Sequence, residues 1–157
     1  MSQQPRLDLA FLLNQSAFAF TAQLETALRG AGVDLREYCV LMKAAEEERT
    51  QNALAELAML DKSTMVTTLD GLEKAGLARR RVSETDRRAR IVTITDDGRR
   101  VLAHATELYD AAVDATLGDL DADVRAAFVD ALTRLTEGRW ATPSHTRGPA
   151  RALSSRK

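Results

Sequence analysis

The sequence contains little that could build a redox centre, a metal cluster or a membrane anchor. Its 157 residues include one cysteine, Cys39, so an internal disulfide and a cysteine-based metal cluster are excluded. No apolar run approaches the roughly 20 residues that a membrane-spanning helix needs. The N-terminal segment MSQQPRLD has neither the basic start nor the cleavage site of a signal peptide. These absences predict a cytoplasmic protein with no membrane partner.

The usual elements of a catalytic or cofactor site are also missing. The two histidines, His104 and His145, are far apart in the sequence and lack companion ligands, so we expect no metal site. The chain has no recognisable Gly-rich phosphate loop, nucleophile elbow or paired-acid catalytic site. We therefore predict no catalytic residues and no cofactor, and we do not expect an enzyme.

Charge is distributed unevenly along the chain, although the net charge is only −1. Residues 79–90 contain six arginines and two acidic residues, whereas residues 104–137 contain eight acidic residues and two arginines. A solvated charged hairpin would account for the basic segment without any function. A compact basic patch on an otherwise acidic chain is, however, typical of a surface that binds nucleic acid.

Apolar residues at helical spacing predict long helices at both ends of the chain. Residues 7–29 are apolar around so much of the helix that burial on more than one side is needed, and a partner chain is the natural cover. Beyond Thr95, helical patterns extend to about 117 and again from 121 to about 137. The apolar stripes of the first and last helices are Leu9, Leu13, Phe20, Leu24 and Leu28, and Val124, Phe128, Leu132 and Leu135.

The middle of the chain predicts a helix-turn-helix. Three helices are expected over about 35–48, 51–58 and 62–75. Each follows a residue whose side-chain oxygen can cap it, namely Asp34, Thr50 and Asp61, with Asp121 in the same role before the last helix. Gly76 is placed to end the third helix. The residues expected to face inward are Leu54, Leu57, Ala58, Met65, Leu69 and Leu72.

Two strands are expected next, over 77–82 and 90–95, because the second segment is rich in β-branched residues. The charged loop 83–89 joins them into a hairpin. A helix-turn-helix followed by such a hairpin is a winged helix-turn-helix. The predicted fold class is therefore mainly α, with a small β-hairpin wing.

The helix over 62–75 has the side chains of a helix that reads a DNA groove. Its outward face carries small hydroxyl residues, where a plain surface helix would more often carry Glu, Lys and Arg. Serine and threonine can bond bases or phosphates, free N–H groups at the helix start favour phosphate, and methyl groups can meet that of thymine. The predicted contacts are Lys62, Ser63, Thr64, Val66 and Thr67.

The hairpin supplies a second predicted DNA contact. Its tip carries Asp86, Arg87 and Arg88, and an arginine there can enter the narrow minor groove of A·T-rich DNA. Phosphates repel a carboxylate, so we expect Asp86 to hold an arginine in place rather than touch DNA. The arginines predicted to reach the DNA backbone from the strands are Arg79, Arg81 and Arg90.

Four motifs in residues 54–98 are similar to those of the MarR family of bacterial transcriptional regulators: Asp61-Lys62-Ser63-Thr64, Leu72-Glu73-Lys74-Ala75-Gly76-Leu77, Asp86-Arg87-Arg88, and Ile94-Thr95 with Gly98. The flanking helices match in order and length, so the resemblance covers about residues 7–137. Two positions depart from the family pattern. Met59 stands where many turns have glycine, and Thr67 replaces a commonly basic or polar contact residue.

The resemblance implies an obligate homodimer that binds a near-palindromic operator. A single domain would span 1–140, with dimerisation helices in 7–30 and 100–137 and a DNA-binding lobe in 34–98, followed by a disordered tail over 141–157. In the family, the arginine that matches Arg88 reaches the minor groove and the acid that matches Asp86 supports it. We predict a sequence-specific, ligand-responsive repressor. An activator, or a winged helix that docks proteins without binding DNA, is the alternative.

Two further expectations concern the signal to which the protein responds. Family members often bind small aromatic or phenolic ligands, and the residues here that could line such a site are Ser16, Phe20, Tyr38, Met42 and His104, although core packing explains most of them more simply. A redox-sensing regulator using Cys39 is the other alternative. Sensor cysteines of the family lie near the start of the first helix, and a lone cysteine in an apolar helix is more often buried, so we predict that Cys39 is not the switch.

Overall fold

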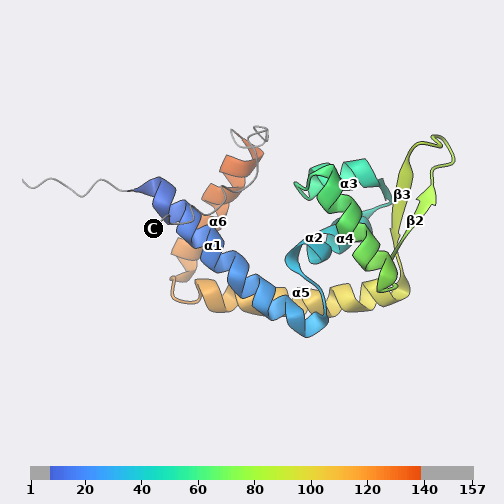
Figure 1. Cartoon of the computed structure of the whole chain (residues 1–157). Helices are drawn as coiled ribbons and strands as arrows, with labels where there is room; N and C mark the ends of the chain where they lie inside the picture. The colour runs from blue at the N-terminus through green and yellow to red at the C-terminus, as the bar shows by residue number, and fades with distance from the viewer. Residues whose placement is uncertain (1–7, 139–157) are drawn as a thin grey trace, which may run out of the picture. The chain divides into compact units, whose positions relative to one another are not determined.

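Residues 8–138 are described by the structure, a computed structural model, and they form two units that divide after Thr116. The predicted tail over 141–157 lies outside the described residues. The elements of the first unit are α1 (Leu9–Leu28), η1 (Arg29–Ala31), α2 (Leu35–Glu46), β1 (Arg49–Thr50), α3 (Gln51–Leu57), α4 (Lys62–Lys74), β2 (Ala78–Val82), β3 (Arg90–Ile94) and α5 (Asp96–Leu117) (Figure 1). The second unit contains α6 (Ala122–Glu137).

Side-chain caps set the starts of the central helices, as predicted. The Asp34 carboxylate accepts the Glu37 N–H at 2.8 Å and the Glu37 carboxylate accepts the Asp34 N–H at 3.0 Å, which is a capping box. Thr50 Oγ1 accepts the Ala53 N–H at 3.1 Å at the start of α3. The prediction for α6 is wrong in one respect, because Asp121 occupies the N-cap position without a side-chain hydrogen bond.

The turn between α3 and α4 is closed by a methionine in a left-handed conformation. Met59 has φ +52°, and its side chain is 83% exposed. Its N–H donates to the Glu56 carbonyl at 3.1 Å, and the Leu60 N–H donates to the Ala55 carbonyl at 2.8 Å. A methionine therefore adopts here the conformation that glycine would adopt more easily.

The sheet has three antiparallel strands in the order β1-β3-β2, one more than the sequence predicted. In the wing, Ala78 pairs with Ile94 and Val82 with Arg90. On the other side of β3, Arg49 pairs with Val92 and Thr50 with Ile91. A two-residue strand has no periodicity of its own, and β1 exists only because the chain before α3 lies along β3.

The core of the first unit lies between the end of α1, the helices α2, α3 and α4, the sheet and the first half of α5. Its largest fully buried side chains are Leu28, Val40, Leu41, Leu54, Met65, Leu69, Leu72 and Val92. The expectation for Leu57 is wrong, since this side chain is 45% exposed. The buried face of α3 is centred between Leu54 and Ala55, which places Leu57 about 110° away around the helix.

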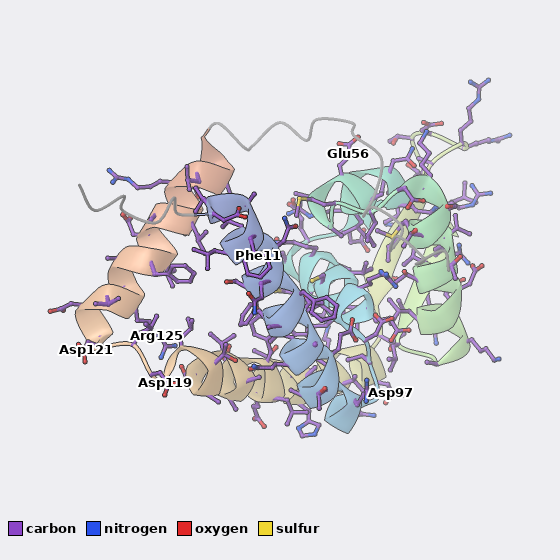
Figure 2. The ribbon with its side chains drawn as sticks, turned by 60° about the vertical axis from the view of Figure 1, so that its left-hand side comes forward. Phe11, Glu56, Asp97, Asp119, Asp121 and Arg125 are labelled. Carbon is purple, nitrogen blue, oxygen red and sulfur yellow. The ribbon has the colours of Figure 1, made fainter. Side chains whose placement is uncertain are left out.

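The first and last helices leave apolar side chains exposed within the single chain. In α1 only Leu24 and Leu28 are buried, while Phe18 and Phe11 are 80% and 60% exposed (Phe11 is labelled in Figure 2). α6 has no buried residue. Helical spacing also predicts that the stripe of Val124, Phe128, Leu132 and Leu135 faces inward. This prediction is wrong for an isolated chain, because Val124, Phe128 and Leu135 are exposed. Among the described residues, no helix is long and apolar enough to cross a membrane.

Candidate nucleic-acid interface

The helix α4 is held in the lobe by one face and offers the opposite face to solvent. Met65, Leu69 and Leu72 are fully buried against the core. Gly76, with φ +74°, ends the helix, and the Leu77 N–H returns to the Leu72 carbonyl at 2.9 Å. The predicted contact residues lie on the open face: Lys62, Ser63, Val66 and Thr67 are exposed, and Thr64 is half-buried.

Hydrogen bonds to Asp61 organise the first turn of α4. The Ser63 and Thr64 hydroxyls each donate to one oxygen of this carboxylate at 2.6 Å, and the Thr64 N–H donates to it at 3.0 Å. These bonds, the Ser63 hydroxyl's first, hold the pKa of Asp61 well below its usual range. The Thr64 N–H therefore already donates to a carboxylate of the protein. It is not one of the free N–H groups that we expected to bind phosphate at the start of this helix.

A shallow hollow beside this turn is lined in part by a cation, Arg36, that the sequence did not predict as a DNA contact. It lies between the start of α2 and the first turns of α4. Its lining includes Arg36, the neighbouring acidic residues Asp34 and Glu37, and Ser63, Thr64, Thr67 and Thr68. Arg36 is exposed. It is separated from α4 by two elements in the sequence, and nothing in its local pattern marks it as a neighbour of the recognition helix.

Strand β2 is fastened to the end of α4 by one arginine. Arg80 Nε donates to Glu73 Oε2 at 2.9 Å, the Arg80 N–H donates to Glu73 Oε1 at 2.7 Å, and Arg80 Nη2 lies 2.5 Å from Asp70 Oδ1. The Arg80 bonds lower the pKa of the Glu73 carboxyl. Arg80 therefore serves to orient the wing relative to the helix, and its charge is already neutralised.

The wing tip is a folded turn whose backbone is held by side-chain oxygens. Ser83 is buried, and its Oγ accepts the N–H groups of Thr85 and Asp86, each at 3.3 Å. The Asp86 carboxylate accepts the backbone N–H of Arg88 at 2.9 Å. The carboxylate thus contacts the main chain of Arg88 and not its guanidinium group.

The other wing arginines differ in how far acidic residues already engage them. Arg81 Nη2 lies 2.6 Å from Glu48 Oε2, so this side chain is paired across 33 residues of sequence. Arg90 donates to the Arg87 carbonyl at 3.2 Å. Within residues 8–138, Arg79, Arg87 and Arg88 are exposed and have no acidic partner. Figure 1 shows the β2–β3 hairpin extending beyond the helices of the lobe.

The five residues considered for a ligand have different environments. Tyr38 is buried and its ring stacks on Tyr109, with centroids 5.0 Å apart, and Met42 packs partly buried against the same core. Ser16 is exposed and Phe20 half-buried on α1, while the His104 side chain on α5 is 55% exposed. A hollow between α1 and α5 is lined by other residues: Ala22, Gln23, Thr26, Ala27, Ala112 and Ala115.

Cys39 lies on α2, partly buried against the core. Burial raises the pKa of its thiol, and the Asp34 charge raises it further, while Lys43 acts in the opposite direction. A raised pKa keeps the sulfur in its unreactive thiol form at neutral pH. Within the described part of the chain, no group of three potential ligands could hold a metal ion.

Comparison with known proteins identifies the family. The sequence pattern of the MarR family matches residues 31–89. The transcriptional regulator HosA of Escherichia coli O157:H7 is 31% identical over 100 residues, which are 63% of this chain and 74% of HosA. The chain belongs to the MarR family. It is a transcriptional regulator with a mainly helical, winged helix-turn-helix fold, as the sequence predicted.

Solved structures of MarR-family regulators share this fold over most of their length. A MarR-family regulator from Rhodococcus sp. RHA1 is 29% identical, with a TM-score of 0.77 over 85% of this chain and 96% of that chain. CouR from Rhodococcus jostii RHA1, bound to p-coumaroyl-CoA, is 29% identical, with a TM-score of 0.74 over 93% of this chain and all of CouR. The repressor CouR has also been solved on a 23-mer DNA duplex, with a TM-score of 0.77 and 25% identity over 86% of this chain and 99% of that one.

Proposed function

We propose that this MarR-family regulator is a repressor that binds a near-palindromic operator as a homodimer. The observation that carries the proposal is the pairing of two features in one lobe. The open face of α4 carries Ser63, Thr64 and Thr67, and the wing beside it ends in arginines that have no acidic partner among residues 8–138. The structure of the repressor CouR on a DNA duplex supports the same use of the fold.

In this proposal the helix and the wing perform different tasks. The first turns of α4 enter the major groove, where side chains can reach base edges. Arg88 enters the minor groove, which it senses by width and negative potential. The cations proposed to bind the DNA backbone are Lys62, Arg79, Arg87, Arg90 and Arg36. Arg81 can bind phosphate only after its ion pair with Glu48 breaks.

The exposed apolar side chains of α1 and α6 are the proposed dimer surface. Side chains such as Phe18 and Phe128 would be costly to leave in water, and a second copy of the chain can cover them. Each chain, with a single domain over residues 1–140, would then supply one of the two DNA-binding lobes that contact the two halves of the operator. The two copies of α4 should lie roughly 34 Å apart, about one turn of B-DNA.

A small aromatic effector is the proposed signal, by analogy with CouR, which has been solved with p-coumaroyl-CoA. Its site would lie between the dimerisation helices and the DNA-binding lobe, and the residues proposed to contribute to it are Ser16, Phe20, Tyr38, Met42 and His104. Binding there would change the spacing of the two lobes and release the DNA. The proposed regulator acts in the cytoplasm and catalyses no reaction.

Two experiments test this function. Selection from a randomised 30-bp duplex pool first identifies the preferred site, and fluorescence anisotropy then measures the affinity for that site. The purified protein should enrich a two-fold symmetric site and bind it at least about 10³-fold more tightly than a scrambled duplex at physiological salt. The double variant Arg87→Ala/Arg88→Ala should lose this affinity, whereas Arg81→Ala, which removes a wing arginine already paired with Glu48, should lose much less of it. A protein that enriches no sequence and binds all duplexes equally would refute the proposal.

A further inference from the structure

All hydroxyl protons on the first turns of α4 are already donated inside the protein. The Ser63 and Thr64 hydroxyls donate to the Asp61 carboxylate at 2.6 Å. The Thr67 hydroxyl donates to the Ser63 carbonyl at 3.1 Å, and the buried Thr68 hydroxyl donates to the Thr64 carbonyl at 2.8 Å. The helix that faces the groove therefore has its hydroxyl groups oriented before DNA arrives.

A hydroxyl group has one proton to donate and lone pairs that accept. Once the proton points back into the protein, the outward side of the oxygen can only accept a hydrogen bond. For Ser63 and Thr64 this orientation is firmly held, because bonds to an ionised carboxylate are roughly twice as strong as neutral ones. Asp61 is ionised at neutral pH, because the hydrogen bonds that its carboxylate accepts lower its pKa.

We propose that the exposed hydroxyls of α4 read the exocyclic amino groups of adenine and cytosine and discriminate against the acceptor edges of guanine and thymine. This inference rests on the proposed function, in which α4 lies in the major groove. There, adenine N6 and cytosine N4 are the hydrogen-bond donors, while guanine O6 and N7 and thymine O4 are acceptors. Phosphate oxygens are acceptors too, so the same hydroxyls contribute little to backbone binding.

The surrounding side chains fit this division of tasks. Lys62 is the donor on the exposed face of the first turn, and Arg36 lines the hollow beside it. Phosphate binding thus falls to the cations, while the hydroxyls are left for bases. The Thr67 and Val66 methyl groups lie on the same face, where they can meet a thymine methyl, and in an A·T pair that methyl accompanies an adenine amino group.

The test removes single hydrogen-bonding groups from the DNA bases and single hydroxyl groups from the protein. The full-length protein first selects its preferred site from a randomised duplex pool. Each adenine of that site is then replaced in turn by purine, and each cytosine by 2-pyrimidinone, to remove one amino group, while 7-deaza bases remove the N7 acceptor in matched duplexes. Binding is measured for the parent, Thr64→Val, Thr67→Val, Thr67→Ser and the buried control Thr68→Val.

At a base that a threonine reads, loss of the amino group should weaken binding of the parent about fivefold or more, the worth of one hydrogen bond. The valine variant of that threonine should bind the DNA with and without the amino group equally well. Thr67→Ser and Thr68→Val should show the same loss of affinity as the parent. A penalty that depends on threonine but follows loss of N7 would overturn the inference, as would threonine variants with unchanged base preference. If the parent selects no site at all, the proposed function itself fails.

Discussion

Single arginines of the wing differ in whether an acid already neutralises them, and this difference should decide their contribution to DNA binding. Arg80 is shared between Glu73 and Asp70, and Arg81 is paired with Glu48. Arg88 is exposed and lacks an acidic partner within residues 8–138. A paired arginine must give up its carboxylate before it can bind phosphate, so its net gain on binding is smaller.

Arg88→Ala should therefore weaken DNA binding more than Arg81→Ala does. The slope of log K against log salt should decrease by roughly one for Arg88→Ala, and by less for Arg81→Ala. Anisotropy titrations of one duplex across a salt series measure both slopes. Equal slopes for the two variants would show that the Arg81–Glu48 pair does not persist on DNA.

Asp86 offers a test in which simple electrostatics and the structure predict opposite signs. Removing an acid near phosphates should strengthen binding if charge alone mattered. The Asp86 carboxylate accepts the Arg88 N–H at 2.9 Å, so Asp86→Ala should instead weaken binding by misplacing Arg88. Asp86→Asn is the matched control, because an amide oxygen can accept the same bond, and it should bind at least as well as the parent. Tighter binding by Asp86→Ala would contradict this account.

The chemistry of Cys39 predicts an unreactive thiol. Burial raises its pKa, so alkylation by iodoacetamide should remain slow through pH 8.5, where an ordinary thiol is half ionised, and accelerate only at higher pH. The urea-unfolded protein is the control and should react at the ordinary rate. Cys39→Ser should leave DNA binding and its response to peroxide unchanged. Peroxide-driven release from DNA that disappears in this variant would establish a redox switch.

At the scale of elements, the position of the wing depends on the junction between α4 and β2. Arg80 on β2 bonds Glu73 and Asp70 on α4, so helix and strand move as one piece. The start of α5 closes the same junction, because a side chain at Gly98 would lie 2.0 Å from the Leu77 carbonyl oxygen. This junction therefore sets the relative positions of the proposed major-groove and minor-groove contacts.

Glu73→Gln should lower the free energy of unfolding at pH 7 by about 1–2 kcal/mol, toward the lower end of the value of a hydrogen bond to a charged group, because the Glu73 side chain is partly exposed to water. Because folding lowers the pKa of Glu73, its stabilisation is present above the unfolded-state pKa of about 4.3 and is lost as pH falls through the folded-state value. Urea unfolding at pH 7 and at pH 3 should show the difference shrinking. Glu56→Gln, an exposed residue of α3 (Figure 2), should show no difference at either pH.

At the scale of the whole molecule, we propose that a second chain covers the exposed apolar side chains of α1 and α6. Residues such as Phe18 and Val124 are 80% and 52% exposed in the single chain. A family member that presents two recognition helices to a palindrome needs these surfaces covered. Dimerisation and operator binding should thus be lost together when either surface becomes charged.

Phe18→Asp and Phe128→Asp should each produce a monomer at micromolar concentration, and each should weaken binding to a two-fold symmetric site much more than to a half-site. Sedimentation velocity measures the mass. Met59→Gln is the control, because Met59 is as exposed as Phe18 but lies in the turn between α3 and α4. A parent protein that sediments as a stable monomer would exclude the proposed dimer.

The sequence by itself determined the features that depend on residues close together in the chain. Asp34, Thr50 and Asp61 start helices because each caps an N–H three residues ahead. Met65, Leu69 and Leu72 are buried because their spacing places them on one side of α4. The family, the mainly helical class and the position of the wing followed from such local patterns.

Only the tertiary structure decided the features that depend on residues far apart. β1 exists by pairing with β3, Arg81 is neutralised by Glu48, and Arg36 lies beside α4, although no local pattern records these proximities. Packing around α3 left Leu57 exposed, because the buried face is chosen by the neighbours and not by hydrophobicity alone. Hydrophobic spacing indicates which residues can be buried, while the fold determines what meets them and which charges remain available for DNA.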